Sequence, residues 1–331
     1  MLRVLTCGHA CLALTGQVRI TPSFRASGME QKTQPAGDTL HLDPETRTET
    51  GSARPSALRR LTVMERSRGL RRVNLRELWE YRSLILTLIA RHVQVRYAQS
   101  VLGVGWSLIR PLISMVMFTI VFERFVRVPS DGRPYPVFSL AAVVPWAYFS
   151  AALSGASESL TSSGSMITKV YFPRLVLPIS FVAAALVDLA IGLGLLLLVL
   201  MWFGITPSVS SIVIVPLLIV AMMLTATGVG CVVTALDIQY RDLKHVVPLL
   251  LQVWMYASPV VYPMSIVPES YRQLYALNPM AGTIATFRSV LLGTDAGDWP
   301  AVGRALASSA LICAVGVVFF RYREPVFADV V

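Results

Sequence analysis

The chain of 331 residues is too apolar for a water-soluble protein of its size. Hydrophobic residues make up 54% of the sequence, charged residues make up 15%, and the mean hydropathy is +0.61. Soluble domains carry about 25% charged residues, so this composition argues against a cytosolic globular enzyme. It also excludes a disordered chain and a disulfide scaffold, since the four cysteines are scattered. The composition predicts an all-α, multi-pass membrane protein.

The positive charge is concentrated in the N-terminal third of the chain. The net charge is +10, and residues 1–110 hold 17 of the 29 Lys and Arg but only 8 of the 19 Asp and Glu. A basic flank beside membrane spans usually marks the cytoplasmic side, where anionic lipids attract it. A nucleic-acid-binding role would account for this charge but not for the apolar segments that follow, so we expect no nucleic-acid partner.

Residues 1–70 are predicted to be a disordered or mis-annotated N-terminal extension. Residues 21–55 are rich in Thr, Ser, Pro, Gly and Asp and show no helical or strand periodicity, which is typical of disorder. A short, interrupted apolar stretch at the very start leaves a signal peptide open as an alternative. A natural start at Met64 is another.

A basic amphipathic helix is predicted from Leu75 to Gln94. Charged and polar residues recur there every three or four positions, while Leu, Ile and Trp fill the other faces. Asn74 is a candidate N-cap, with Glu77 at the capping-box position. Such a helix directly before a membrane span is typical of one lying in the membrane interface. The alternative is a surface helix of a soluble domain.

Six apolar segments follow, and a spanning helix needs about 20 such residues. The predicted spans are Ser107–Val126, Val137–Ala156, Ile179–Phe203, Ile212–Leu236, Val246–Tyr262 and Ala301–Phe320. The basic N-terminal flank and the excess of Lys and Arg in alternate loops predict that both termini lie in the cytoplasm.

The segment between the fifth and sixth spans is neither a span nor a simple loop. Ser270–Leu277 can form two helical turns, Asn278 and Pro279 break them, and Met280–Leu292 is apolar but too short to cross. Short apolar helices that cannot span predict a re-entrant or interfacial hairpin on the outer side. A packed extracellular loop is the alternative.

The sequence carries no motif for chemistry of its own. It has no Gly-rich phosphate loop ending in Lys-Ser or Lys-Thr, no complete dinucleotide fingerprint and no clustered histidines. We therefore expect no catalytic, cofactor or metal site on this chain. Asp188 lies near the middle of a predicted span, where a charge is costly without a partner or water. It serves either a polar contact between helices or a functional role.

Aromatic residues gather near the middle of two predicted spans. We predict that Trp146, Phe149, Trp254 and Tyr256 line a channel, because flat apolar rings with polar edges suit the passage of sugar rings. The alternative is that these rings simply pack between helices.

Four strings then occur in order: RYAQSVLGVGWSLIRP (96–111), ITKVYFPRLVLP (167–178), QYRDLKHVVPLLLQVWMYASPVVYP (239–263) and LNPM (277–280). In this order and at these spacings they closely resemble the permease subunit of bacterial ABC-2 type exporters of polysaccharide, which export O-antigen, capsule or teichoic acid. The resemblance covers roughly residues 74–323, which we take as one transmembrane domain. Residues 324–331 then form a short cytoplasmic tail.

The resemblance implies a permease that moves a lipid-linked, O-antigen-like polysaccharide across the bacterial inner membrane. Two copies of the permease would form a homodimeric channel among membrane lipids. Two copies of a separate ABC ATPase subunit would bind ATP and Mg²⁺, so no cofactor is expected on this chain. The alternative is an ABC-2 type exporter of a drug or a lipid.

The resemblance also implies roles for particular residues. The ATPase interface and coupling region would comprise Leu78, Trp79, Arg82, Glu158, Lys169, Tyr171, Pro173 and Arg174. The outer gate would comprise Pro259, Tyr262, Pro263, Asn278 and Pro279. Arg91, Arg96 and Arg110 would hold an anionic pyrophosphate head where the substrate enters, because the planar guanidinium suits phosphate. The alternative is that these arginines serve lipid headgroups and topology.

Overall fold

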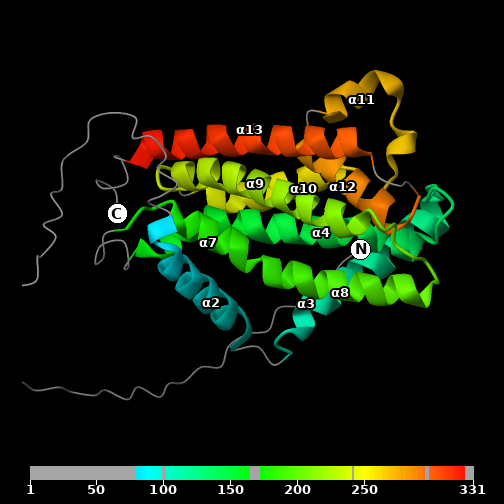
Figure 1. Ribbon diagram of the computed structural model, residues 1–331, viewed down its shortest axis with the longest axis horizontal. Helices are drawn as coiled ribbons and strands as arrows, with labels where there is room; N and C mark the ends of the chain where they lie inside the picture. The colour runs from blue at the N-terminus through cyan, green and yellow to red at the C-terminus, as the bar shows by residue number, and fades with distance from the viewer. Residues whose placement is uncertain are drawn as a thin grey trace, which may run out of the picture. The chain divides into compact units, whose positions relative to one another are not determined.

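The computed structural model describes residues 79–98, 102–164, 172–240, 242–276, 278–294 and 298–324, all within the unit Glu65–Val331. Every regular element in these ranges is a helix, which confirms the predicted all-α class for the described part of the chain (Figure 1). The elements are α2 (Arg82–Ala98), α3 (Gly105–Phe118), η1 (Thr119–Val126), α4 (Tyr135–Ser157), α5 (Ser159–Ser162), α7 (Val176–Ala184), α8 (Leu186–Trp202), α9 (Ser211–Asp237), α10 (Leu243–Tyr256), η2 (Met264–Ile266), α11 (Glu269–Ala276), α12 (Pro279–Leu291) and α13 (Trp299–Arg323).

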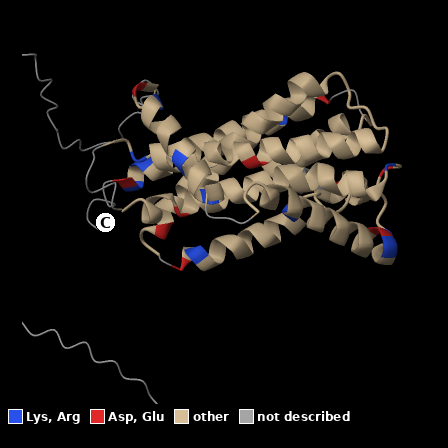
Figure 2. Ribbon diagram, turned by 90° about the horizontal axis from the view of Figure 1, so that it is seen from below, with Lys and Arg blue, Asp and Glu red and all other residues tan. Residues whose placement is uncertain are grey.

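Five helical segments are long and apolar enough to cross a membrane, with 22 to 27 residues each. They are Gly105–Val126 (α3 with η1), Tyr135–Ser157 (α4), Val176–Trp202 (α7 with α8), Ser211–Asp237 (α9) and Trp299–Arg323 (α13). These coincide with five of the six predicted spans. Figure 2 places most charged residues toward the ends of these helices and few along their middles, as a membrane-spanning bundle requires.

The predicted fifth span, Val246–Tyr262, differs from the expectation. Its helix, α10, ends at Tyr256 after 14 residues, or about 21 Å at 1.5 Å per residue, against a bilayer core of about 30 Å. Pro259 and Pro263 explain the early end, because proline lacks a backbone N–H and disfavours helical geometry in the residue before it. The chain therefore leaves the helix in a series of turns.

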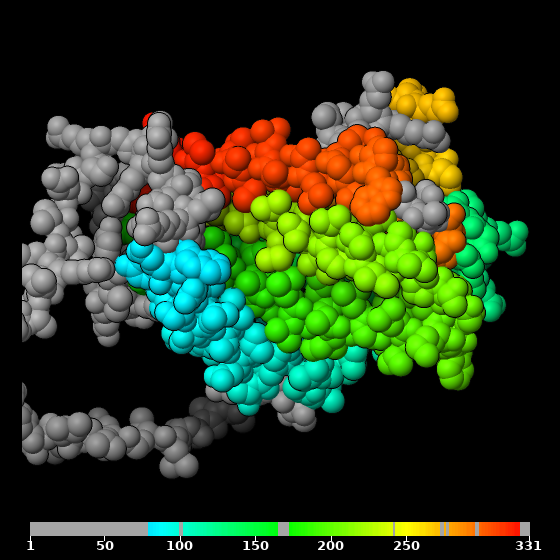
Figure 3. All heavy atoms as spheres, viewed as in Figure 1, coloured from blue at the N-terminus to red at the C-terminus, as the bar shows by residue number. Residues whose placement is uncertain are grey.

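Helix α4 lies at the centre of the bundle. It packs against α3, α7, α8, α9, α10 and α12. In its most apolar stretch of 18 residues, 78% of the residues are buried, compared with 6% in the corresponding stretch of Gly105–Val126. The face turned toward the viewer in Figure 3 is formed chiefly by α13, α9 and α8, in red-orange, yellow-green and green. Large apolar side chains on these helices, including Leu198 and Leu311, are exposed. Within one chain, nearly all residues of the first span are partly or fully exposed, and Pro111 is its one buried residue.

Helices α9 and α13 approach each other unusually closely. A Cβ atom added to Gly316 would lie 2.0 Å from the carbonyl oxygen of Gly228, so only glycine fits at this crossing. Beside it, the hydroxyls of Thr225 and Ser309 are 2.9 Å apart. Small residues and an interhelical hydrogen bond are the means by which helices associate in lipid, where no hydrophobic drive exists.

Two short helices, α11 and α12, lie between α10 and α13, as the sequence predicted. The side chain of Asn278 accepts a hydrogen bond from the backbone N–H of Met280 at 3.1 Å, and Pro279 occupies the first helical position. An Asn cap followed by Pro is a strong helix start. With 13 residues, α12 reaches only about 20 Å and is too short to cross a bilayer.

Candidate functional site

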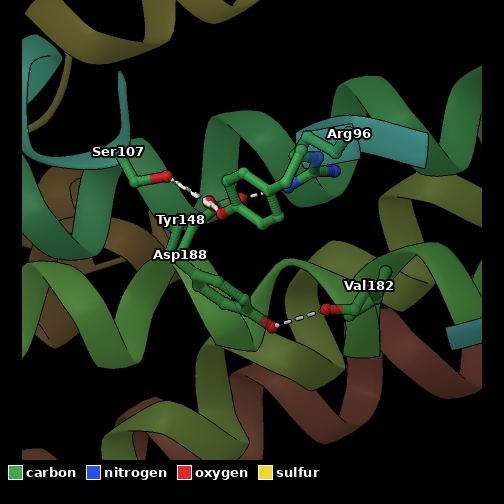
Figure 4. Close-up of polar contacts among 6 residues, drawn as sticks. Arg96, Ser107, Tyr148, Val182 and Asp188 are labelled. Atoms are coloured by element: carbon green, nitrogen blue, oxygen red, sulfur yellow. Dashed lines mark hydrogen bonds and ion pairs between the residues drawn. The ribbon is translucent and has the colours of Figure 1, made fainter. Parts of the chain in front are cut away.

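A cavity of about 610 Å³ opens between α2, α3, α4 and α8. Its polar lining includes Arg96, Tyr97, Ser107, Arg110, Glu158 and Asp188, and its aromatic lining includes Trp106, Tyr148 and Phe181. The hydroxyl of Tyr148 donates to the carbonyl of Val182 at 3.4 Å (Figure 4). The volume lies in the range of small-molecule sites, roughly 300–1,000 Å³.

The carboxylate of Asp188 is the centre of this cavity's polar cluster. It pairs with the guanidinium of Arg96, accepts a hydrogen bond from the hydroxyl of Tyr97, and accepts another from Ser107 Oγ at 2.7 Å (Figure 4). Asp188 stands in the first turn of α8, directly after the junction with α7. Partial burial, reinforced by the hydrogen bond to Asp188, raises the pKa of the Tyr97 phenol. Tyr97 therefore stays protonated and donates.

The three predicted substrate-contacting arginines separate in space. Arg96 and Arg110 line the cavity, whereas Arg91 is exposed on α2 and does not line it. Arg96 is paired with Asp188. Within the described ranges, Arg110 makes no hydrogen bond or ion pair. The cavity thus holds one engaged and one free guanidinium.

A second polar cluster is centred on the side chain of Arg288 in α12. This side chain is buried and donates to three carbonyl oxygens of the turns after α10: Pro259 at 2.6 Å, Val260 at 2.9 Å and Tyr262 at 3.2 Å. Its Cζ atom lies 3.8 Å from the centroid of the Phe138 ring. Arg288 therefore supplies hydrogen-bond donors to backbone carbonyls that lie in turns and have no helical hydrogen bond. The sequence signal was available, because Arg288 interrupts an otherwise apolar stretch.

Asn278 ties the same turns to α10. Its Nδ2 donates to the carbonyl of Ala257 at 3.1 Å and to Ser258 Oγ at 3.0 Å, and its Oδ1 accepts from Trp254 Nε1 at 3.0 Å. A predicted gate residue and a predicted channel residue are thus in direct contact. Of the other predicted gate residues, Pro259, Pro263 and Pro279 are buried, and the Tyr262 hydroxyl donates to the carbonyl of Tyr256 at 2.9 Å.

The four aromatic residues differ in exposure. The rings of Trp146 and Phe149 have centroids 5.5 Å apart, and those of Phe149 and Trp254 are 5.1 Å apart in an edge-on arrangement. Trp146 and Phe149 are buried in the bundle, Trp254 is partly buried, and Tyr256 is exposed. Trp146 and Phe149 thus pack between helices within one chain, and the channel-lining role of the four residues stays a prediction.

Similarity to known proteins extends over most of the helical bundle. Residues 83–292 match the sequence profile of the family described as ABC-2 type transporter. The chain belongs to this family. The match runs from the start of α2 to the end of α12, so it includes both polar clusters.

This ABC-2 family member is similar to several curated proteins named for export or transport. It is 31% identical over 252 residues to the O-antigen export system permease protein RfbA of Myxococcus xanthus, an alignment covering 75% of this chain and 96% of the relative. It is 25% identical to the Klebsiella pneumoniae protein of the same name, over 75% and 94% of the two chains. It is 20% identical to the polysialic acid transport protein KpsM of Escherichia coli, over 72% and 92%.

The residues predicted to couple this ABC-2 protein to an ATPase are only partly described. Trp79 and Arg82 are exposed, with the Arg82 Cζ atom 5.3 Å from the Trp79 ring centroid. Glu158 lines the cavity, Pro173 is buried, and the Arg174 guanidinium donates to the carbonyl of Glu324 at 3.3 Å. Leu78, Lys169 and Tyr171 lie outside the described residues. Among the residues that are described, no group of three or more His, Cys, Asp or Glu could hold a metal ion.

Proposed function

We propose that this chain is the membrane-spanning permease of an ATP-driven exporter that moves a lipid-linked polysaccharide, of the O-antigen kind, across the bacterial inner membrane. The observation that carries the proposal is the length of the alignments: two proteins named as O-antigen export permeases and one named as a polysialic acid transport protein are matched over 92–96% of their own length. Family membership is independent support for transport rather than catalysis.

The energy for export comes from a partner in this proposal. The sequence has no phosphate-binding loop, so two copies of a separate ABC ATPase bind ATP and Mg²⁺ at the cytoplasmic side. The exposed Trp79 and Arg82 offer the partner an aromatic and a cationic side chain. The working unit contains two copies of the permease. The first span supports this, because within one chain only 6% of the residues in its most apolar stretch are fully buried.

We further propose six crossings with both termini in the cytoplasm and α2 in the membrane interface. The fifth crossing combines α10 with the turns at residues 257–263, and α11 and α12 form a hairpin that re-enters the outer half of the membrane. Non-helical backbone is tolerated at membrane depth only where its polar groups are satisfied. The hydrogen bonds from Arg288 and Asn278 to this backbone support the arrangement.

In this mechanism the two clusters act at opposite stages of transport. Arg96 and Arg110 hold the anionic head of the substrate at the inner cavity, since guanidinium groups bind phosphate with charge-assisted hydrogen bonds. The aromatic residues from Trp146 to Tyr256 contact the glycan, and the turns held by Arg288 close the outer side. ATP binding by the partner shifts the permease between closed and open states.

The test is deletion of this gene in its own bacterium, followed by detection of glycan on the cell surface and of lipid-linked glycan inside the cell. We expect surface glycan to disappear, lipid-linked glycan to accumulate, and a plasmid copy of the gene to restore export. Intact surface glycan in the deletion strain would contradict the proposal and favour export of a drug or a lipid. ATP hydrolysis by the purified chain without a partner would contradict the proposal that a separate ATPase subunit hydrolyses ATP.

A further inference from the structure

Asp188 lies where a small anion would bind. Three donors from two separate segments converge on its carboxylate: Arg96 and Tyr97 at the end of α2, and Ser107 in α3 (Figure 4). Carboxylate and phosphate oxygens accept the same charge-assisted hydrogen bonds from such donors. The donors that hold the Asp188 carboxylate therefore also suit a phosphate oxygen.

This site is open to exchange. The side chains of Arg96 and Asp188 are 34% and 22% exposed, and both line the cavity of about 610 Å³. Arg110 lines the same cavity, is exposed, and has no partner in the described part of the chain. An occupied anion site beside a free guanidinium suits a diphosphate, which needs more cationic contact than one carboxylate.

The cluster also connects two helices, α2 and α8. Arg96 and Asp188 are 92 positions apart and join α2 to α8. The earlier part of α2 is held differently: Leu88 is buried against α7, and the rings of His92 and Phe181 have centroids 3.8 Å apart. Loss of the Arg96 contact thus frees the last turn of α2 and leaves the rest docked.

We propose that Asp188 is a placeholder for the substrate: the phosphate group of the lipid-linked glycan displaces the Asp188 carboxylate from Arg96, Tyr97 and Ser107. The inference rests on the proposed function and adds the residue with which the substrate competes. Displacement separates the end of α2 from α8, so arrival of substrate at the cavity changes the helix that leads toward the expected ATPase interface.

The experiment measures binding of farnesyl pyrophosphate to the full chain with its partner ATPase, in phosphatidylcholine nanodiscs. Asp188→Asn keeps the side-chain volume and removes the competing charge, so we expect it to bind about 10-fold more tightly than the wild type. Arg96→Ala should weaken binding, and adding Asp188→Asn to Arg96→Ala should give no gain. Equal affinities of the wild type and Asp188→Asn would overturn the proposal.

Four controls separate this exchange from general electrostatics and from other phosphate sources. Glu158→Gln removes one charge from the same cavity without touching Arg96, and should change affinity less than Asp188→Asn. Inorganic pyrophosphate should show the Asp188 dependence more weakly, and farnesol should show none. Phosphatidylglycerol in the nanodisc should not compete; full competition would identify a lipid headgroup site and overturn the proposal.

A second measurement needs no variant. Hydrogen exchange at the end of α2 in the wild-type complex should increase when farnesyl pyrophosphate binds, because the Arg96 contact to α8 opens. Unchanged or slower exchange would count against displacement. Surface glycan in the complemented deletion strain distinguishes failure of the placeholder proposal from failure of the proposed export function. Restored glycan with equal affinities refutes the placeholder alone, whereas no restoration refutes the export role and the ligand assigned to Asp188.

Discussion

The two arginine clusters of this permease show how the same side chain serves two different purposes. Arg96 meets a carboxylate in an open cavity and is one-third exposed, whereas Arg288 is 6% exposed and meets three backbone carbonyls. A carboxylate can be replaced by another anion, but the carbonyls of a folded turn cannot. The Asp188 cluster therefore suits replacement of one anion by another, whereas the Arg288 cluster holds the backbone of the turns.

The largest expected effect comes from Arg288→Ala. The variant leaves three carbonyls without donors in a buried site, and each buried acceptor left without a donor costs about 1–3 kcal/mol. We expect little folded protein in the membrane and a strongly lowered unfolding temperature in detergent. Arg304→Ala is the matched control, because Arg304 is exposed and 3.8 Å from Asp298. Similar losses of folded protein for Arg288→Ala and Arg304→Ala would contradict the structural role assigned to the Arg288 cluster.

A smaller effect is expected at the helix cap. Asn278→Ala removes the cap of α12 and the contacts to Trp254, Ala257 and Ser258, and loss of a cap alone costs about 0.5–2 kcal/mol. Asn278→Asp keeps the acceptor for the cap and for the Trp254 indole but loses both donors, so its unfolding temperature should fall between those of Ala and the wild type. An aspartate variant as unstable as alanine would show that the Nδ2 donors dominate.

The smallest stability change is expected for Asp188→Asn. A partly exposed ion pair contributes about 0–1 kcal/mol, so the unfolding temperature should shift little even though ligand affinity changes. Raising NaCl from 0.05 to about 1 M shortens the screening length to about 3 Å. The higher salt concentration should weaken the Arg96–Asp188 ion pair without affecting the stability contributed by Arg288. A large fall in the unfolding temperature of Asp188→Asn would show that the Asp188 cluster is structural, like the Arg288 cluster.

The sequence predicted the crossing helices well and the clusters poorly, for physical reasons. A span must supply about 20 apolar residues wherever it occurs, so Ile212–Leu236 marks α9 to within one residue at each end. The fifth segment failed as a single helix because its apolar character continues through Pro259, where helical hydrogen bonding stops.

The partners within each cluster could not be read from the chain. Arg96 finds Asp188 only because α2 packs against α7, which leads directly into α8, and no local pattern encodes a contact across 92 positions. Arg288 binds backbone carbonyls, which carry no residue identity at all. The sequence did predict that Arg96 and Arg110 act at one place, and they do line one cavity, whereas Arg91 lies outside it.

Transport by purified components tests the central claim most directly. The chain and its partner ATPase would be reconstituted in liposomes with a polyprenyl-pyrophosphate-linked oligosaccharide, and glycan would be detected on the side of the membrane opposite the ATPase. Transfer should require ATP and both proteins, and should fall in Arg96→Ala. Transfer without ATP, or none with a fully active ATPase and an intact lipid-linked glycan, would contradict the role of this chain as a polysaccharide permease.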